Sequence, residues 1–222
     1  YTYRQSSPVN QEETVATIWD TPFELPKAGL RGQSFGRRAV AYVLDNVIYL
    51  GSLFLVVAFF AIASSLVLSI AYPNHTPVPQ SNAADQYIEI WSVVLFFIYT
   101  ILFEWLFGAT PGKLLLGMRV VTAVGQPCGL LAAAVRAALR LIDGLFFAIP
   151  AYASMSSSDL RQRLGDKAAR TVVVRSSDPA IVRRRSGWLF LVAATIYLLV
   201  ITGFALYYLL VGLRLETFQP AV

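Results

Sequence analysis

One stretch of the sequence, FGATPGKLLLGM at residues 107–118, has the residue types of a phosphate-binding loop. Such a loop needs four residues between its two glycines and a Ser or Thr after the Lys, because that hydroxyl holds Mg²⁺. Here only three residues separate Gly108 from Gly112, and Leu114 follows Lys113. The stretch also follows a long apolar run rather than a short strand. We therefore expect no ATPase or GTPase, and predict a chain that is not an enzyme and has no cofactor.

A second set of candidate residues consists of charged side chains within apolar sequence. Arg38 and Asp45 are seven residues apart, so they share a helix face but lie about 10 Å apart, too far for a direct ion pair. Arg136, Arg140 and Asp143 form a similar stripe. Because a charge near the bilayer centre costs about 2.5–3.5 kcal/mol, we expect Asp45 to pair with Arg136 or Arg140. Asp143 is expected to pair with an arginine of another element. These pairs serve either as an ion or proton relay or as buried links that fix helix register.

The remaining polar residues predict little chemistry. Glu104 is expected at the membrane interface, outside any relay. No metal site is expected, because the chain has one His and one Cys and they form no cluster with carboxylates. The net charge of +5 fits the loops of a membrane protein better than nucleic-acid binding. Arg183, Arg184 and Arg185, directly before the last apolar run, are expected to anchor the topology and to contact anionic lipid.

The composition predicts the elements that must position these residues. Hydrophobic residues make up 56% of the chain and charged residues 14%, whereas soluble domains carry about 25% charged residues. Apolar runs predict transmembrane helices over about 47–71, 87–107 and 188–212, each long enough to cross about 30 Å of hydrocarbon. The predicted fold is an all-α polytopic membrane protein.

The basic residues predict the topology. Arginines and a lysine precede the first run, whereas residues 72–86 contain none, so the polar tail 1–33 is predicted to be cytoplasmic and that loop external. A spanning helix over 129–155 would put the basic stretch 161–185 outside. We therefore predict an interfacial helix over about 129–143 and a re-entrant half-helix after it, with a fourth span as the rival interpretation.

Two short segments have the alternation of β-strands. They are GMRVVTA at 117–123 and ARTVVVR at 169–175, which flank the predicted re-entrant segment. Pairing them would form a small cytoplasmic ribbon at its base.

Three motifs within residues 34–175 resemble the RDD family of bacterial membrane proteins, named for one Arg and two Asp. The resemblance implies a multi-pass protein of the bacterial cytoplasmic (inner) membrane and a role in transport, with sodium/proton exchange linked to some members. The second Asp of the name corresponds to Asp143 or Asp166, with Asp166 slightly favoured. Residues 176–222, a basic linker and the last helix, lie outside the region that resembles the family. The motif residues are Arg38 and Asp45 in FGRRAVAYVLD, Thr110, Pro111, Gly112, Lys113 and Gly117 in ATPGKLLLGMRVV, and Arg163, Leu164, Asp166, Lys167 and Thr171 in RQRLGDKAARTVVV.

Two functions are compatible with these features. The first is a non-enzymatic subunit that packs within a larger membrane assembly, with the bilayer and other membrane subunits as its partners. The second is a small cation- or proton-coupled transporter that works as a homo-oligomer. The few polar residues within the apolar runs favour the first, and the resemblance favours the second.

Overall fold

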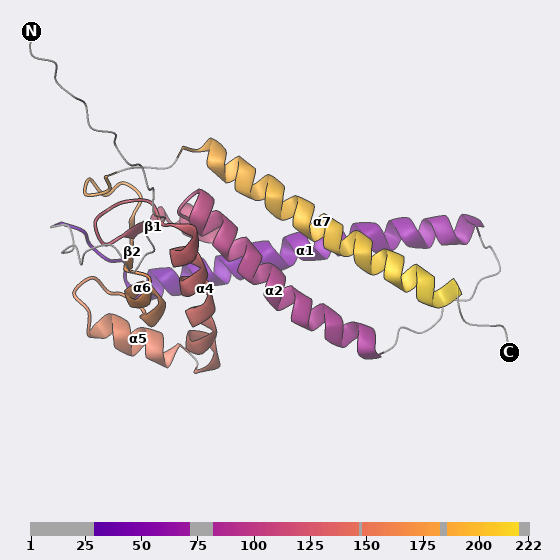
Figure 1. The fold of residues 1–222 in the computed structure, drawn as a ribbon, viewed down its shortest axis with the longest axis horizontal. Helices are drawn as coiled ribbons and strands as arrows, with labels where there is room; N and C mark the ends of the chain where they lie inside the picture. The colour runs from indigo at the N-terminus through magenta and orange to yellow at the C-terminus, as the bar shows by residue number, and fades with distance from the viewer. Residues whose placement is uncertain (1–28, 72–81, 147, 183–185, 218–222) are drawn as a thin grey trace, which may run out of the picture.

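The computed structural model describes residues 29–71, 82–146, 148–182 and 186–217. Three long helices, α1 (Phe35–Ala71), α2 (Asn82–Leu106) and α7 (Trp188–Thr217), extend from a smaller head at one end (Figure 1). The head consists of α3 (Pro111–Leu115), β1 (Met118–Thr122), α4 (Leu130–Leu145), α5 (Ile149–Ser156), α6 (Leu164–Ala168) and β2 (Thr171–Arg175).

Two of the long helices contain a segment long and apolar enough to cross a membrane. These segments are Phe35–Val67 in α1 and Trp188–Tyr207 in α7, whereas the apolar segment of α2, Ile90–Leu106, is shorter. The apolar runs predicted as transmembrane helices at 47–71 and 188–212 therefore lie in α1 and α7, the helices that contain these segments. A third span along α2 stays a prediction.

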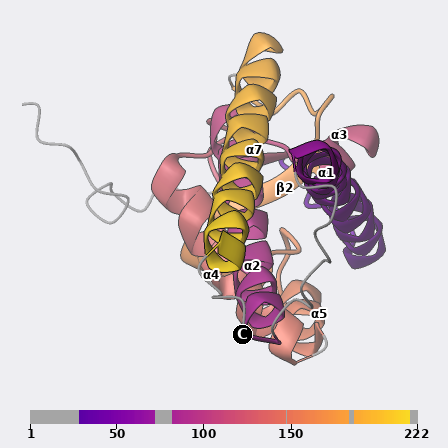
Figure 2. The same ribbon diagram turned by 90° about the vertical axis from the view of Figure 1, so that its right-hand side faces the viewer.

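The long helices pack through aromatic side chains. α7 packs against both α1 and α2, and the end-on view of Figure 2 shows α1 to one side of α7. Tyr99 of α2 lies at the centre, with its ring 5.2 Å from that of Tyr197 and 5.0 Å from that of Phe103. The buried members of this core are Tyr49, Leu95, Tyr99, Phe103, Ala193, Tyr197 and Ile201.

The two strands pair antiparallel, with Val120 opposite Val173. The ribbon predicted from 117–123 and 169–175 is thus confirmed, while its cytoplasmic location stays a prediction. Both faces of the ribbon are covered, which explains why its valines are not restricted to alternate positions. One face packs with Ala132 and Ala133 of α4, and the other packs with Leu30 and Ile181.

The segment 129–155 forms two helices rather than one. α4 ends at Leu145, and α5 begins after Ala148, whose φ of 61° is incompatible with a continuous helix. The predicted helix over 129–143 is confirmed, and a single spanning helix over 129–155 is not formed. α4 packs across α2 and α6 within the head. Whether the α4–α5 region enters the membrane stays a prediction.

Some predictions fall on residues outside the described ranges. These are most of the polar tail (1–28), the loop at 72–81, and Arg183, Arg184 and Arg185. The last residues of the predicted tail belong to the head, because Leu30 is buried in its core and Gln33 donates its N–H to the Val173 carbonyl at 2.8 Å.

Candidate functional site

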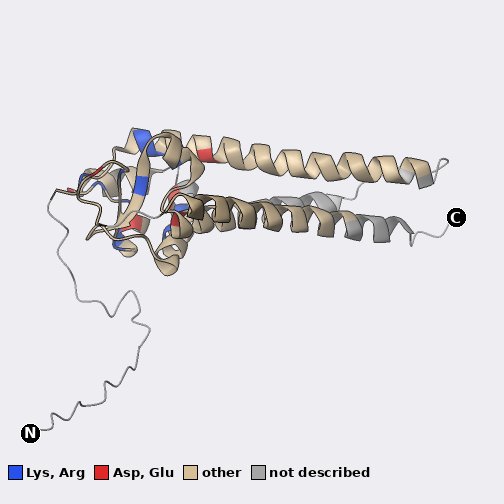
Figure 3. Ribbon diagram, turned by 90° about the horizontal axis from the view of Figure 1, so that it is seen from above, with Lys and Arg blue, Asp and Glu red and all other residues tan. Residues whose placement is uncertain are grey.

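The largely buried charged side chains gather where the head meets the long helices (Figure 3). We call this set the charge cluster. Burying charges is unfavourable unless they are paired and hydrogen-bonded, so their partners decide what the cluster can do. Its members are Arg38 and Asp45 of α1, Glu104 of α2, Lys113 of α3, Arg136, Arg140 and Asp143 of α4, Asp166 of α6, and Arg163 directly before α6.

A tight turn brings α3 back over the end of α2. Gly108, with φ of 85°, ends α2 and donates its N–H to the Phe103 carbonyl at 3.0 Å, as glycines after helix ends commonly do. Pro111 then starts α3, at the first helical position that proline favours. The turn therefore places Lys113 within reach of Glu104.

Glu104 is fully buried at the centre of the charge cluster. Its Oε2 accepts a hydrogen bond from Arg136 Nε at 2.9 Å, and its Oε1 accepts one from Arg140 Nη2 at 3.1 Å. Lys113 Nζ forms a third ion pair with Oε1. Leaving Glu104 out of the predicted charge network was wrong, because α3 and α4 cover this end of α2 and bring its three cationic partners to it. Its location at the membrane interface stays a prediction.

Arg136 joins Glu104 to a second buried carboxylate, Asp166. Arg136 Nη1 pairs with Asp166 Oδ1 and also donates to Thr171 Oγ1 at 2.7 Å. Arg38 Nη1 pairs with the other oxygen, Oδ2. Arg38 and Asp166 are 128 residues apart in the sequence, so this ion pair ties the start of α1 to the head.

Asp45 accepts hydrogen bonds from neutral donors. Its Oδ2 accepts from Thr110 Oγ1 at 2.6 Å, and its Oδ1 accepts from the Gly112 N–H at 2.7 Å and from Tyr99 OH at 3.0 Å. A Cβ on Gly112 would lie 2.8 Å from the Asp45 backbone nitrogen and even closer to the Ala41 carbonyl oxygen. The turn at 110–112 therefore requires glycine to approach α1.

The predicted ion pair between Asp45 and either Arg136 or Arg140 is wrong. Both arginines bind Glu104 instead. Asp45 faces the turn after α2, whose hydroxyl and backbone donors satisfy the carboxylate without a cation.

Asp143 lies 3.7 Å from Arg163, measured between Oδ2 and Nη1. The prediction that Asp143 pairs with an arginine of another element is thus confirmed. Arg163 also caps α6, because its backbone N–H donates to Asp166 Oδ2 at 3.2 Å. Burial raises the pKa of Asp143 and lowers the pKa of Arg163 to about 10.

The charge cluster has more positive than negative groups, with five cationic side chains and four carboxylates. Burial lowers the pKa of Lys113 to about 8, although Glu104 opposes this shift. Burial alone would raise the pKa of Asp166, but the surrounding guanidinium groups, Arg136 foremost, hold it well below its ordinary value. Several buried guanidinium nitrogens have no hydrogen-bond partner, namely Arg38 Nε and Nη2, Arg136 Nη2, Arg140 Nε and Arg163 Nε.

The TPGK turn does not form a phosphate cradle. The Gly112 N–H and the Lys113 ammonium, which would face a phosphate, are bound to Asp45 and Glu104 respectively. The turn follows a helix rather than a strand, and α3 is only five residues long. Within the described ranges, no three His, Cys, Asp or Glu side chains are grouped to hold a metal ion.

The other motif residues take different places. Thr171 accepts a hydrogen bond from Arg136 of the charge cluster, whereas Lys167 is exposed on α6. Gly117, with φ of 62°, forms the turn between α3 and β1. The central position of Glu104 was not predicted from the sequence. Charge balance could have indicated it, since the predicted network held three arginines but only two carboxylates.

The order and geometry of these residues agree with one family. The RDD family model matches residues 33–170, a region that includes every described member of the charge cluster. No curated protein and no solved structure matches the sequence. The chain, whose described residues are mostly helical and include two helices apolar enough to span a membrane and a small two-stranded sheet, belongs to the RDD family.

Proposed function

We propose that this RDD-family chain is a non-enzymatic subunit of a larger assembly in a bacterial cytoplasmic membrane. In this proposal α1, α2 and α7 all span the bilayer, and the head lies in the cytoplasm. The 25 residues of α2 would extend about 37 Å as a helix, which is sufficient for about 30 Å of hydrocarbon. The basic residues of the head and their absence from residues 72–86 support this orientation.

The orientation can be tested at Ser177, an exposed residue of the head. In a Cys128→Ser background, Ser177→Cys should react with an impermeant thiol reagent only after cells are opened. Labelling in intact cells would place the head outside and refute the proposed topology.

The observation that carries the subunit proposal is a face of small residues on α1. At about 100° per residue, five small side chains between Gly51 and Ser69 fall within a sector of about 80°, which they share with Phe54, 71% exposed. Small residues allow helices to approach closely in membranes, where they are enriched at helix–helix contacts. Four of them are exposed in the isolated chain, and Ala58 is half-buried. The five residues are Gly51, Ala58, Ala61, Ser65 and Ser69.

This small-residue face points away from the rest of the chain. The residues of α1 that pack into the aromatic core, Tyr49, Leu53 and Val56, lie about 80–140° from Ala61 by the same rotation per residue, in the direction opposite to the other four small residues. The face is thus available to a helix of another protein. Leu66, which is 60% exposed, lies about 140° from Ala61 and serves as a control position.

The pairing of the charge cluster also supports a subunit. Intramembrane ion paths use ionisable residues facing a cavity, but residues 47–71, 90–103 and 188–212 contain no Asp, Glu, Lys, Arg or His. The charged groups of the head bind one another and join α1, α2, α4 and α6. An ion path through the membrane that uses carboxylate, histidine or cationic side chains would therefore need them from another chain.

Site-specific photocrosslinking in native membranes tests the proposal. A benzophenone amino acid at Ala61 should crosslink to one defined polypeptide other than this chain, and the same group at Leu66 should not. Crosslinking only to a second copy, or only to lipid at both positions, would contradict the subunit proposal.

One observation favours the second candidate, a proton- or cation-coupled transporter working as a homo-oligomer. Lys113 is buried against Glu104 at the end of α2, and its pKa is lowered to about 8. A group that exchanges its proton near neutral pH suits a relay. The purified chain in vesicles would then carry a proton or cation flux that Lys113→Met abolishes, whereas the subunit proposal predicts no flux from this chain alone.

A further inference from the structure

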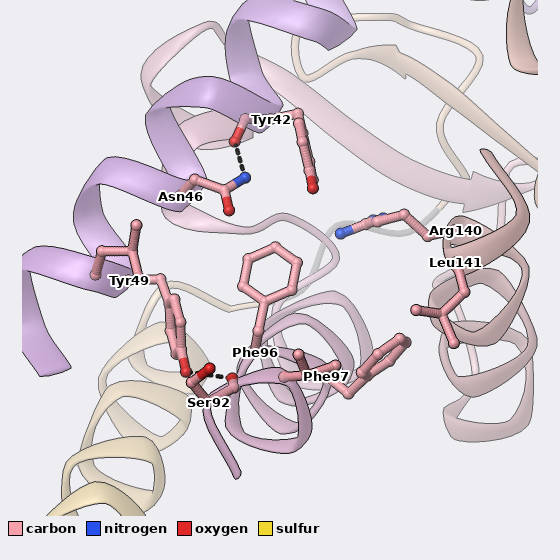
Figure 4. A pocket seen from close by; sticks show the side chains of 10 residues that line it. Tyr42, Asn46, Tyr49, Ser92, Phe96, Phe97, Arg140 and Leu141 are labelled. Atoms are coloured by element: carbon pink, nitrogen blue, oxygen red, sulfur yellow. Dashed lines mark hydrogen bonds between the residues drawn. The ribbon is translucent and has the colours of Figure 1, made fainter. Parts of the chain in front are cut away.

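A groove opens beside the charge cluster, between α1, α2 and α4 (Figure 4). Its volume is about 390 Å³, enough for part of a small amphiphilic molecule but not for a large polar one. One end is polar and the other apolar. The residues that carry the argument are Tyr42, Leu50, Val93, Phe96, Phe97 and Arg140.

Arg140 forms the polar end of the groove. Its guanidinium points toward the space between Tyr42 and Phe96 (Figure 4), and its side chain is 10% exposed. Nη1 donates to Thr100 Oγ1 at 3.3 Å and Nη2 donates to Glu104 at 3.1 Å. Nε is buried without a hydrogen-bond partner, so the two hydrogen bonds do not use every donor of this guanidinium.

Apart from Asn46 and Ser92, the rest of the groove is aromatic and aliphatic. Phe96 packs edge-on against Tyr42 and Tyr49, with ring centroids 6.1 Å and 5.2 Å apart, which fixes one wall. Leu50 and Val93 line the apolar end and are 55% and 49% exposed. The groove therefore opens sideways along the long helices, where lipid chains would lie in the proposed membrane orientation.

The charge of the neighbouring cluster favours an anion. The cluster has one more cation than carboxylates, and Arg140 is its member that lines this groove. An excess positive charge interacts more strongly with an anion in such a poorly solvated place than in water. A neutral ligand would leave that charge uncompensated.

We propose that this groove binds an anionic phospholipid, with the phosphate at Arg140 and an acyl chain along Leu50, Val93 and Phe97. A guanidinium suits phosphate because it is planar and always charged. Basic pockets between membrane helices on the cytoplasmic side recognise lipid head groups in this manner.

The test compares lipid binding in nanodiscs of phosphatidylglycerol and of phosphatidylcholine. Because Arg140→Gln would also remove a partner of Glu104, the principal variant is Val93→Trp, which fills the apolar end and leaves every charge in place. Leu55→Trp adds the same side chain at a position of α1 that is 68% exposed and does not line the groove. Native mass spectrometry after release from the nanodisc counts the lipids that remain bound.

The unmodified chain should retain phosphatidylglycerol about tenfold more than phosphatidylcholine, because both lipids carry the phosphate but the quaternary ammonium of phosphatidylcholine offsets its charge; tenfold corresponds to about 1.4 kcal/mol. Val93→Trp should lose this preference and Leu55→Trp should keep it. A preference below twofold, or one unaffected by Val93→Trp, would overturn the proposal. So would displacement of the lipid by millimolar inorganic phosphate, because the site would then take the free anion.

Discussion

Neutralising Glu104 is the most informative change in the charge cluster. Glu104→Gln keeps the shape of the side chain but removes the carboxylate that pairs with Lys113 and Arg140. Arg136 retains Asp166 as an ionic partner, so two cations rather than three lose theirs. Breaking a buried ion pair costs about 3–5 kcal/mol, which is a large fraction of the roughly 5–15 kcal/mol by which domains are stable.

The free energy of unfolding in mixed micelles, followed by circular dichroism, measures this loss. We expect Glu104→Gln to lose about 3 kcal/mol or more. Adding Lys113→Met should restore part of the loss, because it removes one stranded cation, and the recovery is the coupling that a double-mutant cycle reports. Lys167→Met, which neutralises an exposed lysine of α6, should leave stability unchanged. Strictly additive losses from Glu104→Gln and Lys113→Met would refute the pairing argument.

Three further predictions concern the other carboxylates and the turn. Asp45→Asn and Thr110→Val should each destabilise the fold by about 1–3 kcal/mol. Their effects should couple in a double-mutant cycle, because Thr110 Oγ1 donates to Asp45 Oδ2 at 2.6 Å. Independent effects would contradict this contact. Gly112→Ala should lower the yield of folded protein in membranes, because its Cβ would overlap α1. Gly36→Ala, whose Cβ would meet no other atom, should leave the yield unchanged. Equal yields of the two variants would contradict the close approach of Gly112 to α1. The pKa of Asp166 is depressed in the folded state, so its contribution is fully present above its unfolded value of about 3.9 and declines as the pH falls below it. The stability difference between the natural chain and Asp166→Asn, measured from pH 6 to pH 2, should therefore shrink below about pH 4; a constant difference would contradict the shift.

Local sequence patterns were sufficient for the elements of the fold. Uncharged runs predict α1 and α7 because length and apolarity are properties of a single segment. The valine-rich strands and their pairing were also recognisable, but their antiparallel direction is a finding of the structure. The two-part structure of 129–155 was predicted from the basic residues that follow it, and the break lies at Ala148, between α4 and α5.

Local sequence patterns could not predict which side chains pair with one another in the charge cluster. Arg38 and Asp166 are 128 residues apart, and Arg136 and Glu104 are 32 apart. Their pairing depends on how α4 crosses the end of α2, which no spacing within one segment encodes. Asp45 was assigned a cation because a buried carboxylate ordinarily needs one, but the backbone N–H of Gly112 and two hydroxyl groups satisfy it.

The mass of the native particle tests the central proposal most directly. The chain would be extracted from its own membrane in a mild detergent at its natural expression level and weighed intact by native mass spectrometry. A subunit of a larger assembly predicts a particle that contains this chain together with a fixed set of other polypeptides. A particle whose protein mass is a whole-number multiple of this chain alone would contradict the proposal and favour the homo-oligomeric transporter.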